Sequence, residues 1–499
     1  MQYIGSGDEM QRIDAYSIET VGIPGIVLME RAALAMEEEI VCRFPSPVSV
    51  TVIAERGNNG GDGLALGRLL LARGYTVSFY EIGGVRHASE SYQTQRKILE
   101  NLGVHFLEKL PDKDSDIWVD AVFGVGLKRD VAGIQWEVLE EVNTRSGFKI
   151  AVDVPSGVDA SSGKILGCAF QADLTITFGL SKIGLVLYPG ASLAGEVVVK
   201  EIGFPEEAVE AVLPKTIRYT KEDLCRLPKR WPWSNKGSYG KVLLIVGTKN
   251  MAGAAYLSAT AAYRTGSGLV RIFTCEENRE ILQSRVPEAI MTTYASDEEA
   301  LAKLPEALDW ATVIGIGPGL GQNARTARLL TAVLQRGSCP LVIDADGINT
   351  LAALKQNGSV SSEYDSYGAP IILTPHLKEM ERLTGKKVAE IQNTLMETAR
   401  EAADATHIFV LKDARTIVSD GSAPTYINMS GNNGMATGGS GDVLTGILCG
   451  LLAGGLSALE AARLGVYCHG LAGDAAAKEK GYYGITAGDL LTYLPDIIR

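Results

Sequence analysis

Residues 430–449 read SGNNGMATGGSGDVLTGILC, a glycine-rich loop that reaches Asp442 and continues directly into an apolar helical pattern. The glycines close to this helix start are Gly434, Gly438, Gly439 and Gly441. They let the backbone turn its N–H groups toward one point, where the helix dipole adds positive potential. A phosphate bound there would lie near Asp442, which could take a proton from an attacking hydroxyl. The alternative is that Asp442 only caps a glycine-rich helix start.

The composition limits the class of protein. The chain has 499 residues, 46% hydrophobic and 21% charged, which predicts about two or three globular domains. A net charge of −12 without clusters of Lys and Arg argues against nucleic-acid binding. We expect a cytoplasmic protein without a membrane segment, because no signal peptide and no run of about 18 apolar residues is present. Seven scattered cysteines without CxxC spacing predict neither disulfides nor a zinc site.

From Val48 onward, short β-branched runs alternate with amphipathic helical patterns. This alternation predicts parallel sheets with crossover helices, the doubly wound α/β class, in which ligands bind beyond the carboxyl ends of strands. A charged stretch with several prolines, residues 211–240, interrupts the alternation and predicts a domain boundary. We therefore expect one α/β domain over residues 1–214 and a second over residues 215–499.

Polar clusters follow several predicted strands of the second domain. They are GPGLG (317–321), DADGIN (344–349), TPH (374–376) and KDART (412–416). Each cluster alone also fits a capped strand end or a solvated side chain. Their common position, together with the loop before Asp442, predicts a nucleotide site. The sequence contains no GxxxxGK[ST] run, so a P-loop is not expected.

A second oxygen-rich set lies in the first domain. Residues 54–70, AERGNNGGDGLALGRLL, follow a strand and open a helix without the GxGxxG pattern of dinucleotide folds. The side chains at this turn and at two later strand ends are Asn58, Asn59, Asp62, Asp120, Asp153 and Ser156. They suit either a hard cation or a carboxylate that works as acid and base on a bound ring. An Asn-Gly turn with Asp62 as helix cap is the alternative.

Residues 220–499 resemble the ADP-dependent NAD(P)H-hydrate dehydratases of the ribokinase-like superfamily, most specifically over GNNGMATGGSGDVLTGIL. In that family, ADP phosphorylates the hydroxyl that water has added at C6 of the nicotinamide ring, and loss of phosphate restores the double bond. The resemblance implies that Asp442 is the catalytic base. The implied contacts to hydrated NAD(P)H are Ala254, Gly319, His376 and Asp442. The implied nucleotide-binding residues are Lys412, Asp413, Ala414, Arg415, Thr416 and Gly441. Asp413 stands where that family commonly has glycine.

Residues 8–205 resemble NAD(P)H-hydrate epimerase, a domain fused to the dehydratase in many prokaryotes. The resemblance implies that Asp153 is the acid/base residue. It also implies potassium ligands Asn59, Asp120 and Ser156. The implied substrate-binding residues are Asn58, Asn59, Gly60, Gly61, Asp62, Gly124, Val125, Gly126, Leu127, Lys128, Arg129, Asp130 and Asp153. Glu55 occupies a position that is often glycine in this family.

The two resemblances predict one bifunctional repair enzyme, with a Rossmann-like three-layer domain followed by a ribokinase-like domain. Water adds to the planar ring from either face, and an epimerase would supply the form that a phosphoryl-transfer site can align. We expect ADP, Mg²⁺ and K⁺ as cofactors, hydrated NADH and NADPH as substrates, and a homo-oligomer. The alternative is a ribokinase-like small-molecule kinase fused to a nucleotide-binding or scaffold domain. That kinase would accumulate a stable phosphorylated product.

Overall fold

The computed structural model describes residues 1–83 and 88–498, which form two compact units. One unit is Tyr3–Thr216; the other joins Met1–Gln2 to Ile217–Arg499. The first two residues belong to the second unit, where the amino group of Met1 lies 2.5 Å from Asp223 Oδ2. Among the described residues, no helix is both long and apolar enough to cross a membrane.

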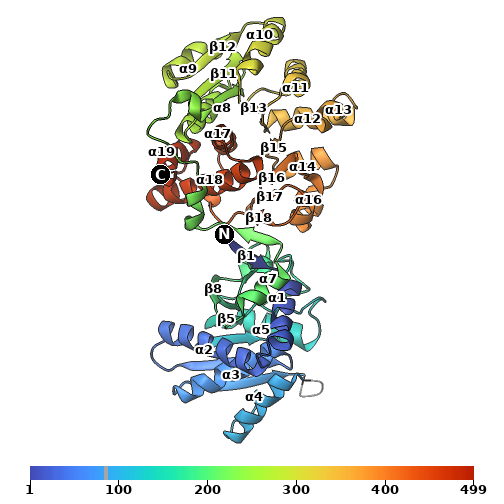
Figure 1. Cartoon of the computed structure of the whole chain (residues 1–499). Helices are drawn as coiled ribbons and strands as arrows, with labels where there is room; N and C mark the ends of the chain where they lie inside the picture. Colours follow the sequence, from blue (N-terminus) through green and yellow to red (C-terminus); the bar gives the residue numbers. More distant parts are fainter. Residues whose placement is uncertain (84–87, 499) are drawn as a thin grey trace. The chain divides into compact units, whose positions relative to one another are not determined.

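The N-terminal unit contains a parallel sheet with strand order β3-β2-β4-β5-β6-β8 (Figure 1). These strands are β2 (Ser49–Glu55), β3 (Thr76–Ile82), β4 (Ile117–Ala121), β5 (Phe148–Val152), β6 (Leu174–Phe178) and β8 (Glu196–Lys200). The helices are α1 (Gly7–Ala15), α2 (Gly25–Arg43), α3 (Asn58–Ala72), α4 (Glu90–Asn101), α5 (Ile134–Thr144), α6 (Gly190–Leu193) and α7 (Glu206–Val212). Short strands β1 (Gln2–Gly5) and β7 (Ser181–Lys182) pair in parallel, and β9 spans Thr216–Arg218.

Helices cover both faces of this sheet, because successive strand residues point to opposite sides. Val52 packs in one hydrophobic core with Leu64 of α3. Its neighbour Ile53 packs in the other core with Val138 of α5. The predicted three-layer arrangement is therefore confirmed.

The C-terminal unit contains a sheet with strand order β12-β11-β10-β13-β14-β15-β16-β17-β18. These strands are β10 (Lys241–Ile245), β11 (Leu269–Cys275), β12 (Ile290–Tyr294), β13 (Val313–Ile316), β14 (Leu341–Ile343), β15 (Ile371–Leu373), β16 (His407–Leu411), β17 (Ile417–Ser419) and β18 (Thr425–Ile427). Strands β10 to β16 pair in parallel, and β17 and β18 add an antiparallel edge. The predicted parallel sheet is confirmed.

Helices surround this sheet, and α17 packs against α8 (Figure 1). The longer helices are α8 (Ala252–Arg264), α10 (Asp297–Trp310), α11 (Ala324–Arg336), α12 (Asp346–Gln356), α17 (Ser440–Ala453), α18 (Ala458–Lys480) and α19 (Ala487–Ile497). The shorter ones are α9 (Arg279–Arg285), α13 (Ser361–Asp365), α14 (Leu377–Thr384), α15 (Val388–Asn393) and α16 (Leu395–Ala402). Gly446 of α17 lies so close to Ser258 and Ala261 of α8 that any Cβ there would clash. The small residues of these helices thus serve packing within the unit.

Candidate active sites

The loop before Asp442 ends at Gly439, whose φ of 91° starts α17 from a left-handed conformation. Glycine adopts this conformation without strain. A Cβ built on Gly441 would lie 3.6 Å from both Asp344 Oδ2 and Lys412 Nζ. The helix start therefore lies directly over the carboxyl ends of β14 and β16, as the sequence predicted.

Asp344 and Lys412 form a buried ion pair below this helix start, with 2.9 Å between Oδ1 and Nζ. Thr374 Oγ1 donates to Asp344 Oδ1 at 2.6 Å, and Thr445 Oγ1 donates to Oδ2 at 2.9 Å. Burial alone would raise the pKa of Asp344, but Lys412 and these hydroxyl groups hold the pKa below its ordinary value. The charges of both Asp344 and Lys412 therefore act on Asp442, in opposite directions.

Asp442 lies in the first turn of α17. Burial, and next the charge of Asp344, raise the pKa of Asp442 to about 6, against the opposing effect of Lys412. A carboxylate with this proton affinity can accept a proton from a substrate hydroxyl near neutral pH.

His376 caps α14. Its Nδ1 atom accepts from the backbone N–H groups of Lys378 at 3.1 Å and Glu379 at 3.3 Å. Glu379 Oε2 in turn accepts from the backbone N–H of His376 at 2.9 Å, which completes a capping box. Burial raises the pKa of Glu379 to about 7. We did not predict Glu379, although the H-x-x-E spacing of a capping box would have indicated it.

Gly319 and Ala254, predicted to contact the same ligand, lie side by side. Gly319 has a φ of 64°, and a Cβ built on it would lie 2.9 Å from Ala254 Cβ. The loop that carries Gly319 is fixed at its far end, where the Gly321 N–H donates to Asp346 Oδ2 at 2.7 Å. The loop thus brings the start of α8 close to the carboxyl end of β13.

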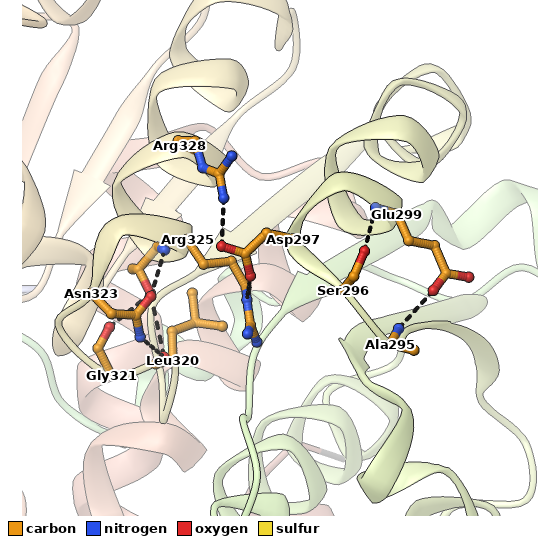
Figure 2. A network of polar contacts seen from close by, with 10 residues as sticks. Ala295, Ser296, Asp297, Glu299, Leu320, Gly321, Asn323, Arg325 and Arg328 are labelled. Carbon is orange, nitrogen blue, oxygen red and sulfur yellow. Dashed lines mark hydrogen bonds and ion pairs between the residues drawn. The ribbon is translucent and has the colours of Figure 1, made fainter.

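Figure 2 shows the polar network that anchors this loop. Asn323 caps α11 by accepting from the Thr326 N–H at 3.0 Å, and its Nδ2 donates to the carbonyl of Leu320 at 3.3 Å. Arg325 and Arg328 of α11 both pair with Asp297, at the start of α10. The network ties the loop to two helices.

The predicted nucleotide segment follows β16. Lys412 pairs with His376 in an isolated parallel bridge, while Asp413 and Ala414 are exposed. Arg415 and Thr416 are half-buried. Asp413 is absent from the non-glycine residues with positive φ. The backbone at Asp413 therefore does not require glycine.

The N-terminal unit encloses a cavity of about 880 Å³ at the carboxyl ends of its strands. Its lining includes the predicted residues Asn58, Asn59, Asp62, Gly124, Val125, Gly126, Leu127, Lys128, Arg129 and Asp153. Gly60, Gly61 and Asp130 lie outside this lining. Gly60 and Gly61 instead allow close packing of α3, since added Cβ atoms would clash with the Glu55 carbonyl and with the Met29 side chain.

Asp120 and Ser156 form a buried cluster behind this cavity. Asp120 Oδ2 accepts from the Ser156 N–H at 2.7 Å, and Oδ1 accepts from Ser156 Oγ at 2.6 Å. Burial raises the pKa of Asp120 to about 6, and no basic side chain pairs with it within residues 1–83 and 88–498. The Nδ2 atom of Asn59 is buried without a hydrogen-bond partner. The Asp120 carboxylate and the Ser156 hydroxyl are oxygen ligands of the kind that a hard cation takes, and Asn59 could add only its Oδ1 atom, because Nδ2 is a donor.

Asp153 follows β5 with a φ of 67°, which is unusual for a residue with a side chain. Its Oδ1 atom lies 2.6 Å from the buried Nζ of Lys182. Lys182 and Asp14 also line the cavity, and neither was predicted. The signal for Lys182 was a single lysine within the otherwise apolar run FGLSKIGLVLYPG, residues 178–190.

The comparisons with known proteins match both halves of the chain. A family model described as "NAD(P)H-hydrate dehydratase" matches residues 242–496, and one described as "YjeF-related protein N-terminus" matches residues 25–184. The bifunctional NAD(P)H-hydrate repair enzyme Nnr of Thermofilum pendens is 37% identical over 98% of this chain and 95% of its own length. The enzyme of the same name from Escherichia coli is 33% identical over 99% of this chain and 93% of its own.

Among solved structures, the ADP/ATP-dependent NAD(P)H-hydrate dehydratase of Bacillus subtilis, co-crystallised with ATP and Mg²⁺, is 30% identical. The match covers 56% of this chain and 96% of that chain, with a TM-score of 0.49. The full-length relatives decide the assignment, because they match both halves in one chain. The protein therefore belongs to the family of bifunctional NAD(P)H-hydrate repair enzymes.

Proposed function

We propose that this chain repairs NAD(P)H to which water has added at C6 of the nicotinamide ring. The N-terminal unit interconverts the R and S epimers, and the C-terminal unit converts the S epimer and ADP to NAD(P)H, AMP and phosphate. Family membership supports both activities. The observation that carries the dehydratase assignment is the position of Asp442 at the open start of α17, beside Lys412.

In the dehydratase reaction, Asp442 takes the proton of the C6 hydroxyl, and the oxygen attacks the β-phosphorus of ADP as the bond to AMP breaks. The backbone N–H groups from Gly439 to Gly441 and the helix dipole stabilise the charge on the transferred phosphoryl group. The C6–O bond then breaks and phosphate leaves with its electron pair. Loss of the C5 proton restores the double bond.

The proposed binding residues are those that the resemblance to the dehydratase family implies. Ala254, Gly319 and His376 border the hydrated nicotinamide nucleotide, and Gly441 contacts both ligands. The segment Lys412–Thr416 holds the AMP portion of ADP. Asp413 is compatible with this role of the segment, because its side chain is exposed and does not fill the loop.

Magnesium would bind together with the nucleotide phosphates, whose charge it would partly neutralise. This suits the C-terminal site: among the described residues, no group of three or more His, Cys, Asp and Glu could hold a metal ion by itself. Potassium would be held by Asn59, Asp120 and Ser156, and would supply the positive charge that buried Asp120 lacks. The cytoplasmic location and the homo-oligomer stay predictions.

In the epimerase reaction, Asp153 exchanges protons with the hydrated ring inside the cavity of the N-terminal unit. The cavity supports this assignment, because Lys128 and Arg129 line it and can pair with the phosphates of the substrate.

Absorbance of reduced nicotinamide tests both activities together, after the protein is mixed with racemic hydrated NADH, ADP, Mg²⁺ and K⁺. Recovery of NADH from both epimers is expected. A halt near half of the full recovery would mean that the epimerase is inactive. Accumulation of a phosphorylated product without NADH would instead favour a small-molecule kinase.

A further inference from the structure

The two oxygens of the Asp153 carboxylate have different surroundings. Oδ1 lies 2.6 Å from Lys182 Nζ, and accepts from Thr177 Oγ1 at 3.0 Å and from the Phe178 N–H at 3.4 Å. In the part of the chain that the structure describes, Oδ2 receives no hydrogen bond. Since Asp153 lines the cavity, Oδ2 is the atom that can accept a substrate proton.

Lys182 is held in the charged form by its surroundings. Its side chain is only 1% exposed, and Nζ donates to Thr177 Oγ1 and to the Phe178 carbonyl, both at 2.7 Å. Together with Asp153 Oδ1, these acceptors use all the N–H groups of an ammonium. Burial lowers the pKa of Lys182, but a neutral amine would point its lone pair at one of the acceptors. The geometry therefore favours an ammonium that holds Asp153 Oδ1 in place.

Asp62, in the first turns of α3, lines the same cavity and has the opposite surroundings. Within the described residues, no basic side chain forms an ion pair with it, and neighbouring Asp14 also lines the cavity without one. Burial, and next the charges of Asp153 and Asp14, raise the pKa of Asp62 well above its ordinary value. The cavity thus contains one carboxylate paired with an ammonium and one carboxyl group among acidic neighbours, the kind of difference by which an enzyme separates a base from an acid.

We propose that Asp62 is the catalytic acid that works with Asp153 in epimerisation, and that Lys182 is a positioning residue that holds the Asp153 carboxylate by its Oδ1 atom. This inference rests on the proposed epimerase function. It gives two carboxyl groups of one cavity opposite tasks.

The proton transfers balance over one cycle. Asp153 Oδ2 takes the proton of the C6 hydroxyl, a C6–O double bond forms, and the C6–N1 bond breaks with its electron pair on N1. Asp62 gives its proton to N1, which leaves an open-chain aldehyde. Rotation about the C5–C6 bond presents the other face of the carbonyl. Ring closure returns the N1 proton to Asp62 and the Asp153 proton to the oxygen, so both side chains regain their starting states.

The substitution Asp62→Asn tests the acid in the full-length protein. Asparagine keeps the shape of the side chain but cannot transfer a proton, so the rate of epimer interconversion should fall roughly 10²–10⁴-fold. The dehydratase rate should not change. Interconversion is followed by chromatographic separation of the epimers without ADP. Glu207→Gln, at an exposed position on α7, is the matched control and should keep the wild-type rate.

The pH profile distinguishes a catalytic acid at Asp62 from a residue that only supports the fold. Other charged groups that line the cavity are Asp14, Glu55, Arg56, Lys128, Arg129, Asp153 and Lys182. Because the acid must be protonated, wild-type epimerisation should decline as pH rises above the pKa of Asp62. The residual activity of Asp62→Asn should lack this decline. The infrared band of protonated carboxyl groups at neutral pH should be weaker in Asp62→Asn than in the wild type, and the part that remains should include Glu379.

Lys182→Met tests the positioning residue. The variant removes the opposite charge that lies 2.6 Å from Asp153 Oδ1, so the rising limb of the epimerisation profile should move to higher pH. Lys182→Arg should move this limb part of the way back to its wild-type pH. A change of thermal stability with an unmoved limb would mean that Lys182 only supports the fold.

The outcomes distinguish a wrong epimerase function from a wrong assignment of Asp62. If wild-type protein does not interconvert the epimers, the proposed epimerase function is wrong. If the wild type is active and Asp62→Asn keeps the same rate and pH profile, the epimerase function stands and the assignment of Asp62 is wrong.

Discussion

Asp442 and Asp153 are the side chains on which the two proposed reactions depend. Asp442→Asn should lower the dehydration rate roughly 10²–10⁴-fold, because an amide cannot accept the hydroxyl proton, and should leave epimerisation unchanged. Asp153→Asn should do the reverse. NADH formation and epimer separation measure the two rates. If either variant stayed folded but lost both activities, the assignment of one base to each unit would be wrong.

The proton affinity of Asp442 predicts a pH dependence of dehydration. Burial and the charge of Asp344 raise the pKa of Asp442 to about 6, and a base works only when it is deprotonated. The ratio kcat/KM should therefore rise as pH increases through about 6. His376→Gln should keep this limb, since burial lowers the pKa of His376 and its Nδ1 atom is occupied in capping α14. A limb that disappears with His376 instead of Asp442 would contradict the assignment.

Local sequence signals revealed some of these side chains and missed others. Asp442 follows a glycine-rich loop at a predicted helix start, and Asp153 stands at a predicted strand end marked by a proline. A short stretch of sequence therefore indicates each of them. Lys182 and Asp14 reach the cavity from different elements, and no local pattern links them. Glu379 looked like an ordinary residue of an amphipathic helix until the structure showed that it is buried beside Lys412. Tertiary packing decides such positions.

At the scale of elements, α3 depends on glycine for its contact with the sheet. A Cβ on Gly63 would clash with Ala121 of β4, so Gly63→Ala should destabilise the N-terminal unit by about 1–3 kcal/mol. Gly253→Ala is the matched control, because a Cβ at this helical position meets no atom within 4 Å. Urea unfolding of the full chain measures both. Equal stability of the two variants would contradict the packing role of Gly63.

Whether a segment forms a helix or a strand was easier to predict than which strands lie beside it in the sheet. Alternating β-branched runs and helical patterns predicted the parallel sheets, and the polar clusters fell at the carboxyl ends of β13, β14, β15 and β16 as expected. The order of the strands is not visible in the sequence. Strand β10, for example, pairs with both β11 and β13, because the chain changes direction across the sheet. That change of direction forms the crevice where ligands bind in this class of fold.

At the scale of the whole molecule, each unit has its own candidate site. The cavity around Asp153 is lined by residues of Tyr3–Thr216 alone. The groups that shift the pKa of Asp442 all belong to Ile217–Arg499. The two reactions share only a small molecule that can diffuse, so neither needs the other site in the same polypeptide.

This independence predicts complementation between inactive chains. With racemic hydrated NADH, Asp442→Asn alone should form no NADH, and Asp153→Asn alone should stop near half of the full recovery. A mixture of the two variants should continue to full recovery, at a late rate proportional to the concentration of the Asp442→Asn chain, because that chain supplies the only active epimerase. The double variant, added in place of Asp442→Asn, is the control for spontaneous epimerisation. A mixture that stops near half would mean that epimerisation requires an intact dehydratase site in the same chain, and the two units could not be treated as separate enzymes.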